Sequence, residues 1–314
     1  MKRRGVGYAA TFYGTGYGNG FPDESRATAE LTKEGIINIY VGVSDVGSGG
    51  ISVMLQIASE TLNINQTFIR IIYDDTSLFH DSGTAAASRQ TYNTGNAVLD
   101  ACRKLKSNLD KYINQSLVTD DLLKEIYQEF IKNSISTIYE GYFKATTSQV
   151  NIETGQGNPY WPYTFGVDKA VVEVDDETGK VDVLEVVKVY DAGKIVNPEL
   201  AEGQLIGGCA MGIGYALMEE VEVHNGSIKN KNFSDYIIPT SKDMPAVKSI
   251  FVEEVEDSGP YGAKGLGEPA MLPTAPAIIN AIYDAVGVRI HEFPATCDRI
   301  LLAIKNKKDQ LNNQ

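Results

Sequence analysis

The sequence is poor in the side chains that usually bind metals. It contains 3 cysteines and 3 histidines in 314 residues. Cys102, Cys209 and Cys297 are far apart, so they support neither a disulfide framework nor the four-thiolate ligand set of an iron–sulfur cluster. The histidines show no ligand spacing, and surface or capping roles are expected for them. Zinc chemistry and an iron–sulfur centre within this chain are therefore not expected.

Long hydrophobic runs are absent too, and positive charge is in the minority. No apolar run approaches the roughly 20 residues of a membrane span, and the basic start Met1–Arg4 lacks the apolar stretch of a signal peptide. A cytoplasmic protein that does not bind membranes is expected. Lys plus Arg number 28 against 41 for Asp plus Glu, a formal net charge of −13, which disfavours nucleic-acid binding. Hydrophobic residues at 43% and charged residues at 22% are typical of a globular protein with its own core.

Glycine, in contrast, is abundant and clustered. Half of the 30 glycines lie in four segments, residues 14–20, 47–50, 203–214 and 262–267. Such segments allow positive φ angles and let the backbone approach a ligand closely. The sequence therefore predicts several loops whose backbone lines a binding site.

A pattern of strand, glycine-containing loop and helix occurs twice. Ile36–Val43 alternates like a strand, and after the glycines at 47–50 apolar residues follow at helical spacing over Ile51–Leu62. Val181–Tyr190 again reads as a strand, and a helical pattern follows over Leu200–Glu220. We therefore predict an α+β fold of two related halves with glycine-rich cofactor-binding loops.

The two predicted halves are residues 1–145 and 146–314, joined by the polar stretch Thr146–Pro159. In the first half, amphipathic helices are expected over Asn96–Leu109 and Leu122–Ile131, because their apolar residues recur at helical spacing.

One carboxylate stands alone in the last glycine cluster. Within Gly262–Pro269, three glycines leave the loop bare and the proline stiffens it, and Glu268 is the only acid between Asp257 and Asp284. Such a carboxylate suits a general base, because burial beside an anionic cofactor would raise its pKa toward neutrality. The alternative is an exposed glutamate in the first turn before the helix Ala275–Val286, where the helix dipole favours it. Taken by itself, the loop favours that alternative.

The wider context favours the base. Gly262–Pro269, followed by an Ala- and Ile-rich helix and by Pro294–Ile300, resembles the end of the molybdenum subunit in the xanthine dehydrogenase family. In that family the glutamate after the last glycine is the catalytic base, a role that falls on Glu268. The resemblance also implies cofactor contacts from the same loop, at Lys264, Gly265 and Gly267.

The resemblance extends to the glycine loop Asp45–Gly50 and the helix that follows it. In the family, the backbone amides of this loop hold the pterin cofactor. The matching residues here are Gly47, Ser48 and Gly49. This sequence departs from the family at Ser48, where a glutamine is usual, so a shorter hydroxyl side chain stands where the family has an amide.

Two further segments match the family in order. Gly83–Arg89 resembles the segment in which an alanine backbone lies close to the molybdenum, with Ala87 at the matching position and Ala86 and Ser88 beside it. Gln204 follows a glycine in the next segment and matches the family glutamine that bonds the pterin. An amide side chain can both donate and accept, which suits a pterin edge.

The N-terminal segment carries the substrate-pocket candidates. Arg4–Gly7 and Phe12–Gly14 are similar to a family segment whose aromatic residues wall the pocket. Tyr13 and Tyr17 are the candidates here, and Tyr13 is the stronger of the two. Core packing is the alternative role for this aromatic pair.

The resemblance covers nearly the whole chain but only the second half of the family's catalytic unit. It implies a second, large molybdopterin subunit that completes the site, and iron–sulfur and FAD subunits that remove electrons, with NAD(P) linked through them. The implied cofactor is molybdenum–molybdopterin cytosine dinucleotide with a terminal sulfide or selenide, and its metal is held through the pterin rather than by protein ligands. This arrangement looks closest to the medium molybdopterin subunit of a nicotinate dehydrogenase.

The implied reaction is hydroxylation of an N-heteroaromatic ring, nicotinate to 6-hydroxynicotinate, with oxygen from water. Glu268 would act as the base, with hydride transfer to the terminal sulfide or selenide on molybdenum. Two alternatives remain: a purine (xanthine) or aldehyde hydroxylase subunit, and a non-catalytic scaffold that only holds the cofactor. An ordinary nucleotide-binding domain ranks lower, because the loops lack both the P-loop ending and the dinucleotide fingerprint.

Overall fold

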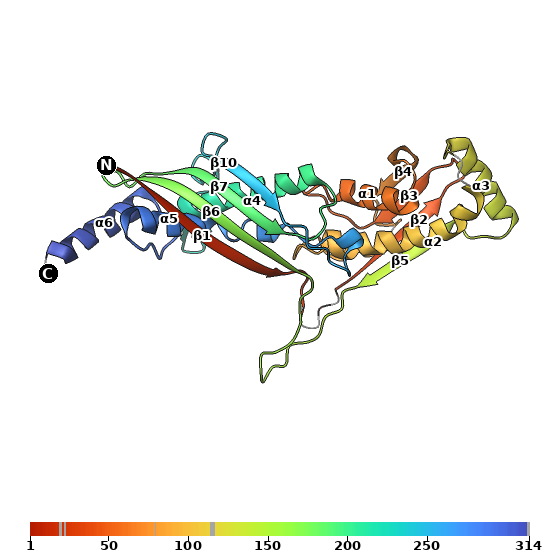
Figure 1. Ribbon diagram of the computed structural model, residues 1–314, viewed down its shortest axis with the longest axis horizontal. Coiled ribbons are helices and arrows are strands. Elements are labelled where there is room, and N and C mark those ends of the chain that lie inside the picture. Colours follow the sequence, from red (N-terminus) through yellow and green to blue (C-terminus); the bar gives the residue numbers. More distant parts are fainter. Residues whose placement is uncertain (19–20, 22, 79, 114–116, 313–314) are drawn as a thin grey trace.

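The computed structural model is elongated, and its two bodies lie end to end along the long axis (Figure 1). It describes residues 1–18, 21, 23–78, 80–113 and 117–312. Position 20, which ends the first glycine cluster, lies outside these residues. Each body has a four-stranded sheet covered by helices, which confirms the α+β class. Over the described residues, no helix is both long and apolar enough to cross a membrane.

The first body has a sheet of strand order β4-β3-β2-β5. Its elements are β2 (Glu24–Leu31), β3 (Ile37–Val41), β4 (Ile69–Ile72), β5 (Ile138–Lys144), α1 (Gly50–Leu62), α2 (Gly95–Ile113), α3 (Asp120–Lys132) and the short helices η1 (Gln66–Phe68) and η2 (Gln90–Thr94). Alternate residues of β2 are buried, from Ser25 to Leu31, because one face of the sheet packs against the helices. Helix α2 lies directly on β5, since a Cβ on Gly141 would stand 2.0 Å from the carbonyl oxygen of Ala97.

The second body has a sheet of strand order β1-β6-β7-β10. Its elements are β1 (Lys2–Gly14), β6 (Tyr163–Asp175), β7 (Val181–Asp191), β10 (Ala246–Phe251), α4 (Pro198–Leu217), α5 (Thr274–Val286), α6 (Cys297–Asn312) and the short helices η3 (Pro260–Gly262) and η4 (Glu268–Ala270). Helix α5 packs on β1, where a Cβ on Gly5 or Gly7 would stand 2.2 Å from a helix carbonyl oxygen.

The pairing of β1 corrects the division of the chain predicted from the sequence. That division placed residues 1–145 in the first half, but β1 pairs with β6 along its whole length, from Lys2 opposite Asp175 to Gly14 opposite Tyr163. The chain therefore starts in the second body with β1, forms the first body from β2 to β5, and returns to the second body with β6. Local periodicity cannot reveal a partner strand more than 150 residues away.

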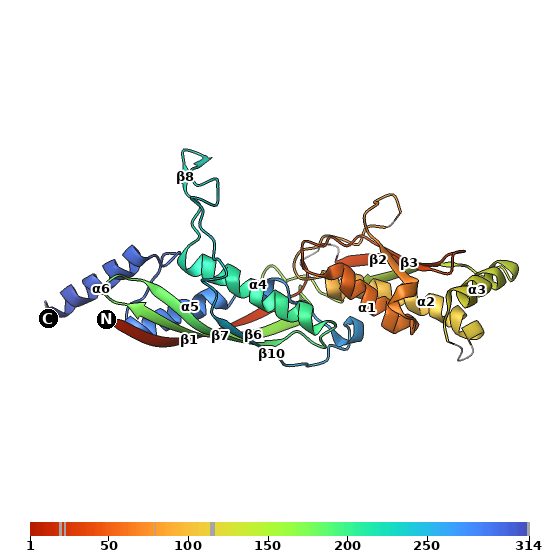
Figure 2. The same ribbon diagram turned by 90° about the horizontal axis from the view of Figure 1, so that it is seen from above.

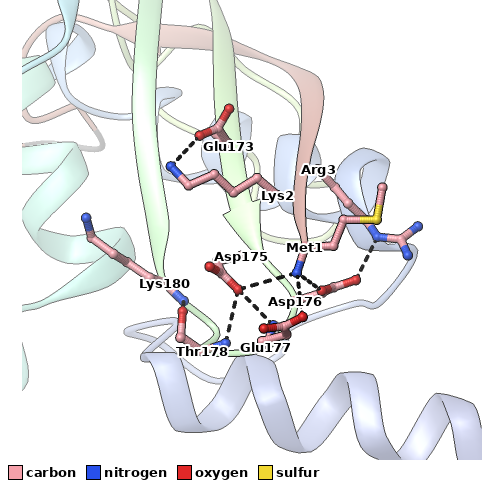
Figure 3. Close-up of polar contacts among 9 residues, drawn as sticks. All are labelled: Met1, Lys2, Arg3, Glu173, Asp175, Asp176, Glu177, Thr178 and Lys180. Atoms are coloured by element: carbon pink, nitrogen blue, oxygen red, sulfur yellow. Dashed lines mark hydrogen bonds and ion pairs between the residues drawn. The ribbon is translucent and has the colours of Figure 1, made fainter.

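Charged contacts fasten the start of β1 to the turn between β6 and β7 (Figure 3). The N-terminal ammonium of Met1 donates to Asp176 Oδ1 at 2.7 Å, and Arg3 Nε donates to Asp176 Oδ2 at 2.9 Å. Lys2 Nζ donates to Glu173 Oε1 at 2.8 Å. The cationic partners are largely exposed, although Asp176 and Glu173 are mostly covered, so these pairs are expected to contribute little to stability.

Two segments extend away from the bodies. The segment between β5 and β6 hangs below the molecule as a long loop (Figure 1). A second arm, with the short strands β8 (Val223–His224) and β9 (Ser227–Ile228), projects from the end of α4 (Figure 2). The helices and strands predicted from periodicity all form, with ends shifted by a few residues.

Candidate active site

A cavity of about 470 Å³ lies between the two bodies. Its walls come from the start of α1, the loop before η2, one face of α4 and the loop around η4. The volume falls within the roughly 300–1,000 Å³ typical of small-molecule and cofactor sites. Six residues predicted from the sequence line it together: Ser48, Ala86, Ser88, Gln204, Gly267 and Glu268. The fold thus brings four distant segments to one place.

Glu268 is held by a side chain from the other body. Its backbone amide donates to Ser88 Oγ at 2.9 Å, and the Ser88 hydroxyl donates back to Glu268 Oε2. One hydroxyl therefore binds both the backbone and the carboxylate of the same residue. Glu268 itself is exposed toward the cavity.

Tyr13, near the end of β1, lies against this pair, while Tyr17 lies in the loop that follows β1. The Tyr13 hydroxyl interacts with Ser88 and Glu268. Burial, and then the charge of Glu268, raise the pKa of Tyr13 to about 12, so its hydroxyl is protonated at neutral pH. The Tyr17 hydroxyl is 2.5 Å from Thr84 Oγ1. The substrate-pocket role of both tyrosines stays a prediction.

The loop that presents Ser88 is strained. Ala87 and Ser88 have φ angles of 55° and 52°, in the left-handed region that side chains other than glycine disfavour. The loop is tied to the N-terminal segment by the Gly16 amide, which donates to the Ala87 carbonyl at 3.0 Å. Ala86 lines the cavity, whereas Ala87, the residue matched to the family, is not among the described lining residues. Strain of this kind persists only where the surroundings impose it.

Arg89, which was not predicted as a site residue, anchors the segment that leads into this loop. Its side chain is buried, and Nε donates to Asp23 Oδ1 at 2.5 Å. The guanidinium also donates to three carbonyl oxygens, those of Ser82 at 3.0 Å, Thr84 at 3.2 Å and Glu24 at 2.6 Å. The sequence offered one signal for this role, an arginine at the end of a run of small residues. An arginine in such a place is usually interpreted as a surface residue.

The glycine loop before α1 differs from its predicted role. Its amides were expected to hold the pterin, but the Asp45 carboxylate accepts from the amides of Gly47 at 2.9 Å, Gly49 at 3.1 Å and Ile51 at 3.3 Å. Partial burial works to raise the pKa of Asp45, but these backbone hydrogen bonds outweigh it and lower the pKa. Ser48 still faces the cavity. Within this chain the loop therefore binds its own carboxylate.

The glycines of α4 fall into two groups. A Cβ on Gly208 would stand 2.7 Å from the Ala270 backbone, and one on Gly212 2.5 Å from Thr274, so these two glycines allow close packing. Gly203 and Gly207 have no atom within 4 Å of a Cβ position. Glycine in a helix costs about 1 kcal/mol relative to alanine. Close packing accounts for Gly208 and Gly212, and open space at the cavity suits Gly207, while Gly203 does not line the cavity.

The cavity offers hydrogen-bonding groups that could hold a cofactor beside Glu268. Gln204 offers both a donor and an acceptor at the wall, and Gly207 leaves the backbone of α4 bare beside it. Two other predicted residues have internal partners. Lys264 Nζ binds Asp191 Oδ2 at 2.7 Å and borders an adjoining pocket of about 80 Å³. A Cβ on Gly265 would stand 2.2 Å from the Ser88 carbonyl oxygen, so that position requires glycine for packing.

Residues 1–245 match the family model described as the molybdopterin cofactor-binding domain. The chain is 33% identical to the xanthine dehydrogenase molybdenum-binding subunit of Escherichia coli O157:H7, over 95% of this chain and 42% of that protein. It is 30% identical to the gamma subunit of the 6-hydroxypseudooxynicotine dehydrogenase complex of Paenarthrobacter nicotinovorans, over 86% of this chain and 36% of that protein.

Among solved structures, the aldehyde oxidoreductase of Desulfovibrio desulfuricans superposes with a TM-score of 0.85 at 34% identity. The match covers 96% of this chain and 32% of that one. The chain therefore spans less than half the length of each of these relatives. It belongs to the molybdopterin cofactor-binding domains of the xanthine dehydrogenase and aldehyde oxidoreductase family.

Proposed function

We propose that this chain is the C-terminal half of the catalytic unit of a molybdenum hydroxylase, with Glu268 as the active-site base. One observation carries the proposal. Among the described residues that line the cavity, Glu268 is the only carboxylic acid, and no lining residue is a histidine, lysine or cysteine. A general base must face the reacting atoms, and Glu268 is the residue of the described lining that can accept a proton.

The residues divide into those that bind the cofactor and those that handle the proton. Gln204 and the bare backbone at Gly207 would hold the pterin of a molybdenum–molybdopterin cofactor. When bound, that cofactor supplies a two-electron acceptor. Glu268 accepts a proton from the water-derived nucleophile, and the hydroxyls of Ser88 and Tyr13 orient its carboxylate.

The substrate we propose is an electron-poor N-heteroaromatic ring, with nicotinate converted to 6-hydroxynicotinate. The relationship to a 6-hydroxypseudooxynicotine dehydrogenase subunit supports this class. Tyr13, half-buried beside Glu268, offers an aromatic surface for such a ring. The second candidate is a xanthine or aldehyde hydroxylase, favoured by the names of the relatives with the higher identity.

A second, large molybdopterin subunit is proposed to close the cavity. The chain corresponds to 42% of a relative's length, so the remainder of that catalytic unit has no counterpart in it. Helix α4 exposes Met211, which is 60% exposed and lines the cavity, where a partner surface would cover it. The proposal also includes iron–sulfur and FAD subunits, which link the enzyme to NAD(P), and a cytoplasmic location. The proposed cofactor carries a cytosine dinucleotide on the pterin and a terminal sulfide or selenide on the molybdenum.

Metal analysis and isotope labelling test this function together. The protein is purified with its partners, and molybdenum and pterin are quantified. The complex is then supplied with nicotinate, xanthine or an aldehyde in ¹⁸O-labelled water. We expect stoichiometric molybdenum, a label in the hydroxylated product, and a loss of about 100- to 10,000-fold in kcat for Glu268→Gln. Full activity of Glu268→Gln with unchanged molybdenum would instead identify a scaffold subunit.

A further inference from the structure

Four polar side chains are completely buried beneath the turn that carries Glu268. They are Asp168 on β6, Lys188 and Tyr190 on β7, and Thr274, the first residue of α5, each with an exposed fraction of 0%. Asp168 and Lys188 are direct neighbours across the two strands. None of the four is among the described residues that line the cavity, so direct contact with a ligand there does not explain them.

The cluster satisfies nearly all of its own polar groups. Lys188 Nζ forms an ion pair with Asp168 Oδ2 and donates to Thr274 Oγ1 at 2.9 Å. Thr274 in turn donates to Asp168 Oδ2 at 2.5 Å, and the hydroxyl of Tyr190 donates to the other carboxylate oxygen at 3.1 Å. The thiol of Cys209 on α4 also faces this ion pair. The position of the Tyr190 hydroxyl is therefore determined by a rigid, buried network.

Tyr190 connects this network to the active site. Its hydroxyl is also 3.1 Å from the carbonyl oxygen of Pro269, the residue next to Glu268. The tyrosine has a single proton to share between these two acceptors, and burial raises its pKa, so that proton stays in place. The ring lies across Gly166 on β6, where a Cβ would stand 2.4 Å from it. The glycine thus makes room for the tyrosine to reach the turn.

Stability alone does not explain a buried ion pair at this place. Desolvation of two charges offsets most of their attraction, and apolar side chains of similar volume would often be at least as stable. What such a network provides is a defined geometry. We infer that Tyr190, held by Asp168, Lys188 and Thr274, is a positioning residue that fixes the turn Glu268–Ala270 through the Pro269 carbonyl.

The inference rests on the proposed function of Glu268 as the base, and the variant that tests it is Tyr190→Phe in the assembled complex. This change keeps the ring and removes the hydroxyl. Its matched control is Tyr139→Phe, which also removes a tyrosine hydroxyl from a hydrogen bond, here a half-buried one that accepts from Asn108 Nδ2 at 2.8 Å in the first body. Two measurements are made on both variants. Hydrogen exchange follows the amides of residues 264–272, and steady-state kinetics follow kcat, KM and the pH profile of kcat.

We expect faster exchange over residues 264–272 in Tyr190→Phe alone, because the Ala270 and Met271 amides lie in turn hydrogen bonds next to the lost contact. We also expect kcat to fall about 10- to 100-fold, since a displacement of about 1 Å can cost 100-fold. KM should change by less than about twofold, and the molybdenum content should stay the same. The Glu268→Gln variant identifies the part of the pH profile of kcat that depends on Glu268, and that part should shift in Tyr190→Phe. Of the described titratable groups, Tyr13 lies beside Glu268. Arg89 also lines the cavity, but its guanidinium is bound to Asp23.

Exchange and kinetics equal to those of Tyr139→Phe would overturn the inference. A lower kcat with an unchanged pH profile would also overturn it, because a purely structural defect gives that result. Should Tyr190→Phe fail to fold, Thr274→Val with Thr274→Ser as the conservative rescue asks the same question through Asp168. If the wild-type complex hydroxylates none of the substrates, the proposed function fails, whereas the exchange measurement still decides whether Tyr190 anchors the turn.

Discussion

The buried Arg89 permits a quantitative prediction about stability. Replacing it by methionine leaves Asp23 as a buried carboxylate without its cation and frees three carbonyl oxygens that the guanidinium now binds. Removing one partner of a buried ion pair typically costs about 3–5 kcal/mol. Total stabilities of domains are about 5–15 kcal/mol. We therefore expect Arg89→Met to remove a large part of the free energy of unfolding.

The assay is urea unfolding of the purified protein, followed by circular dichroism, for Arg89→Met and for Lys124→Met. Lys124 pairs with Asp121 at 3.3 Å on the surface of α3, with side chains 46% and 89% exposed, so its loss should cost less than about 1 kcal/mol. A loss for Arg89→Met no larger than that of the control would refute the reasoning. It would mean that water reaches the site and solvates the Asp23 carboxylate.

Three further outcomes are expected. Ser88→Ala removes both hydrogen bonds to Glu268 and should lower kcat about tenfold or more, with unchanged molybdenum content as the check. Gly207→Leu fills open space that borders the cavity and should lower molybdenum content without lowering the melting temperature, whereas Gly203→Leu, which does not line the cavity, should retain the metal. The lowered pKa of Asp45 stabilises the fold above its unfolded value of 3.8, and this contribution is lost as pH falls through the folded pKa. Asp45→Asn should therefore melt lower than wild type at pH 7, and thermal melts at decreasing pH should show this difference shrink once the pH falls below 3.8.

The strained loop and the buried cluster act on the two sides of Glu268. Arg89 holds the loop that presents Ser88 from the first body, and Tyr190 reaches the Pro269 carbonyl from the second. The carboxylate thus sits where two separately anchored elements meet. Precise placement of a catalytic group usually depends on such supporting contacts.

Much of the local structure could be predicted from the sequence by itself. The periodicity of Ile36–Val43 and Ala275–Val286 predicted a strand and a helix that both form, as β3 and α5. The glycine-rich loop around Glu268 also predicted one exposed carboxylate, and in the structure that carboxylate lines the cavity. These features depend on neighbours along the chain, whose spacing and turn chemistry are visible in the sequence.

Only the tertiary structure decided the rest. The pairing of β1 with β6 and the contact of Ser88 with Glu268 join residues more than 150 positions apart. Arg89 and Asp23, whose side chains form the buried ion pair beneath the Ser88 loop, are 66 positions apart. Which groups become partners depends on how whole elements pack and on which polar atoms lose access to water. A pattern along the chain does not contain that information, because both conditions arise only when distant segments are brought together.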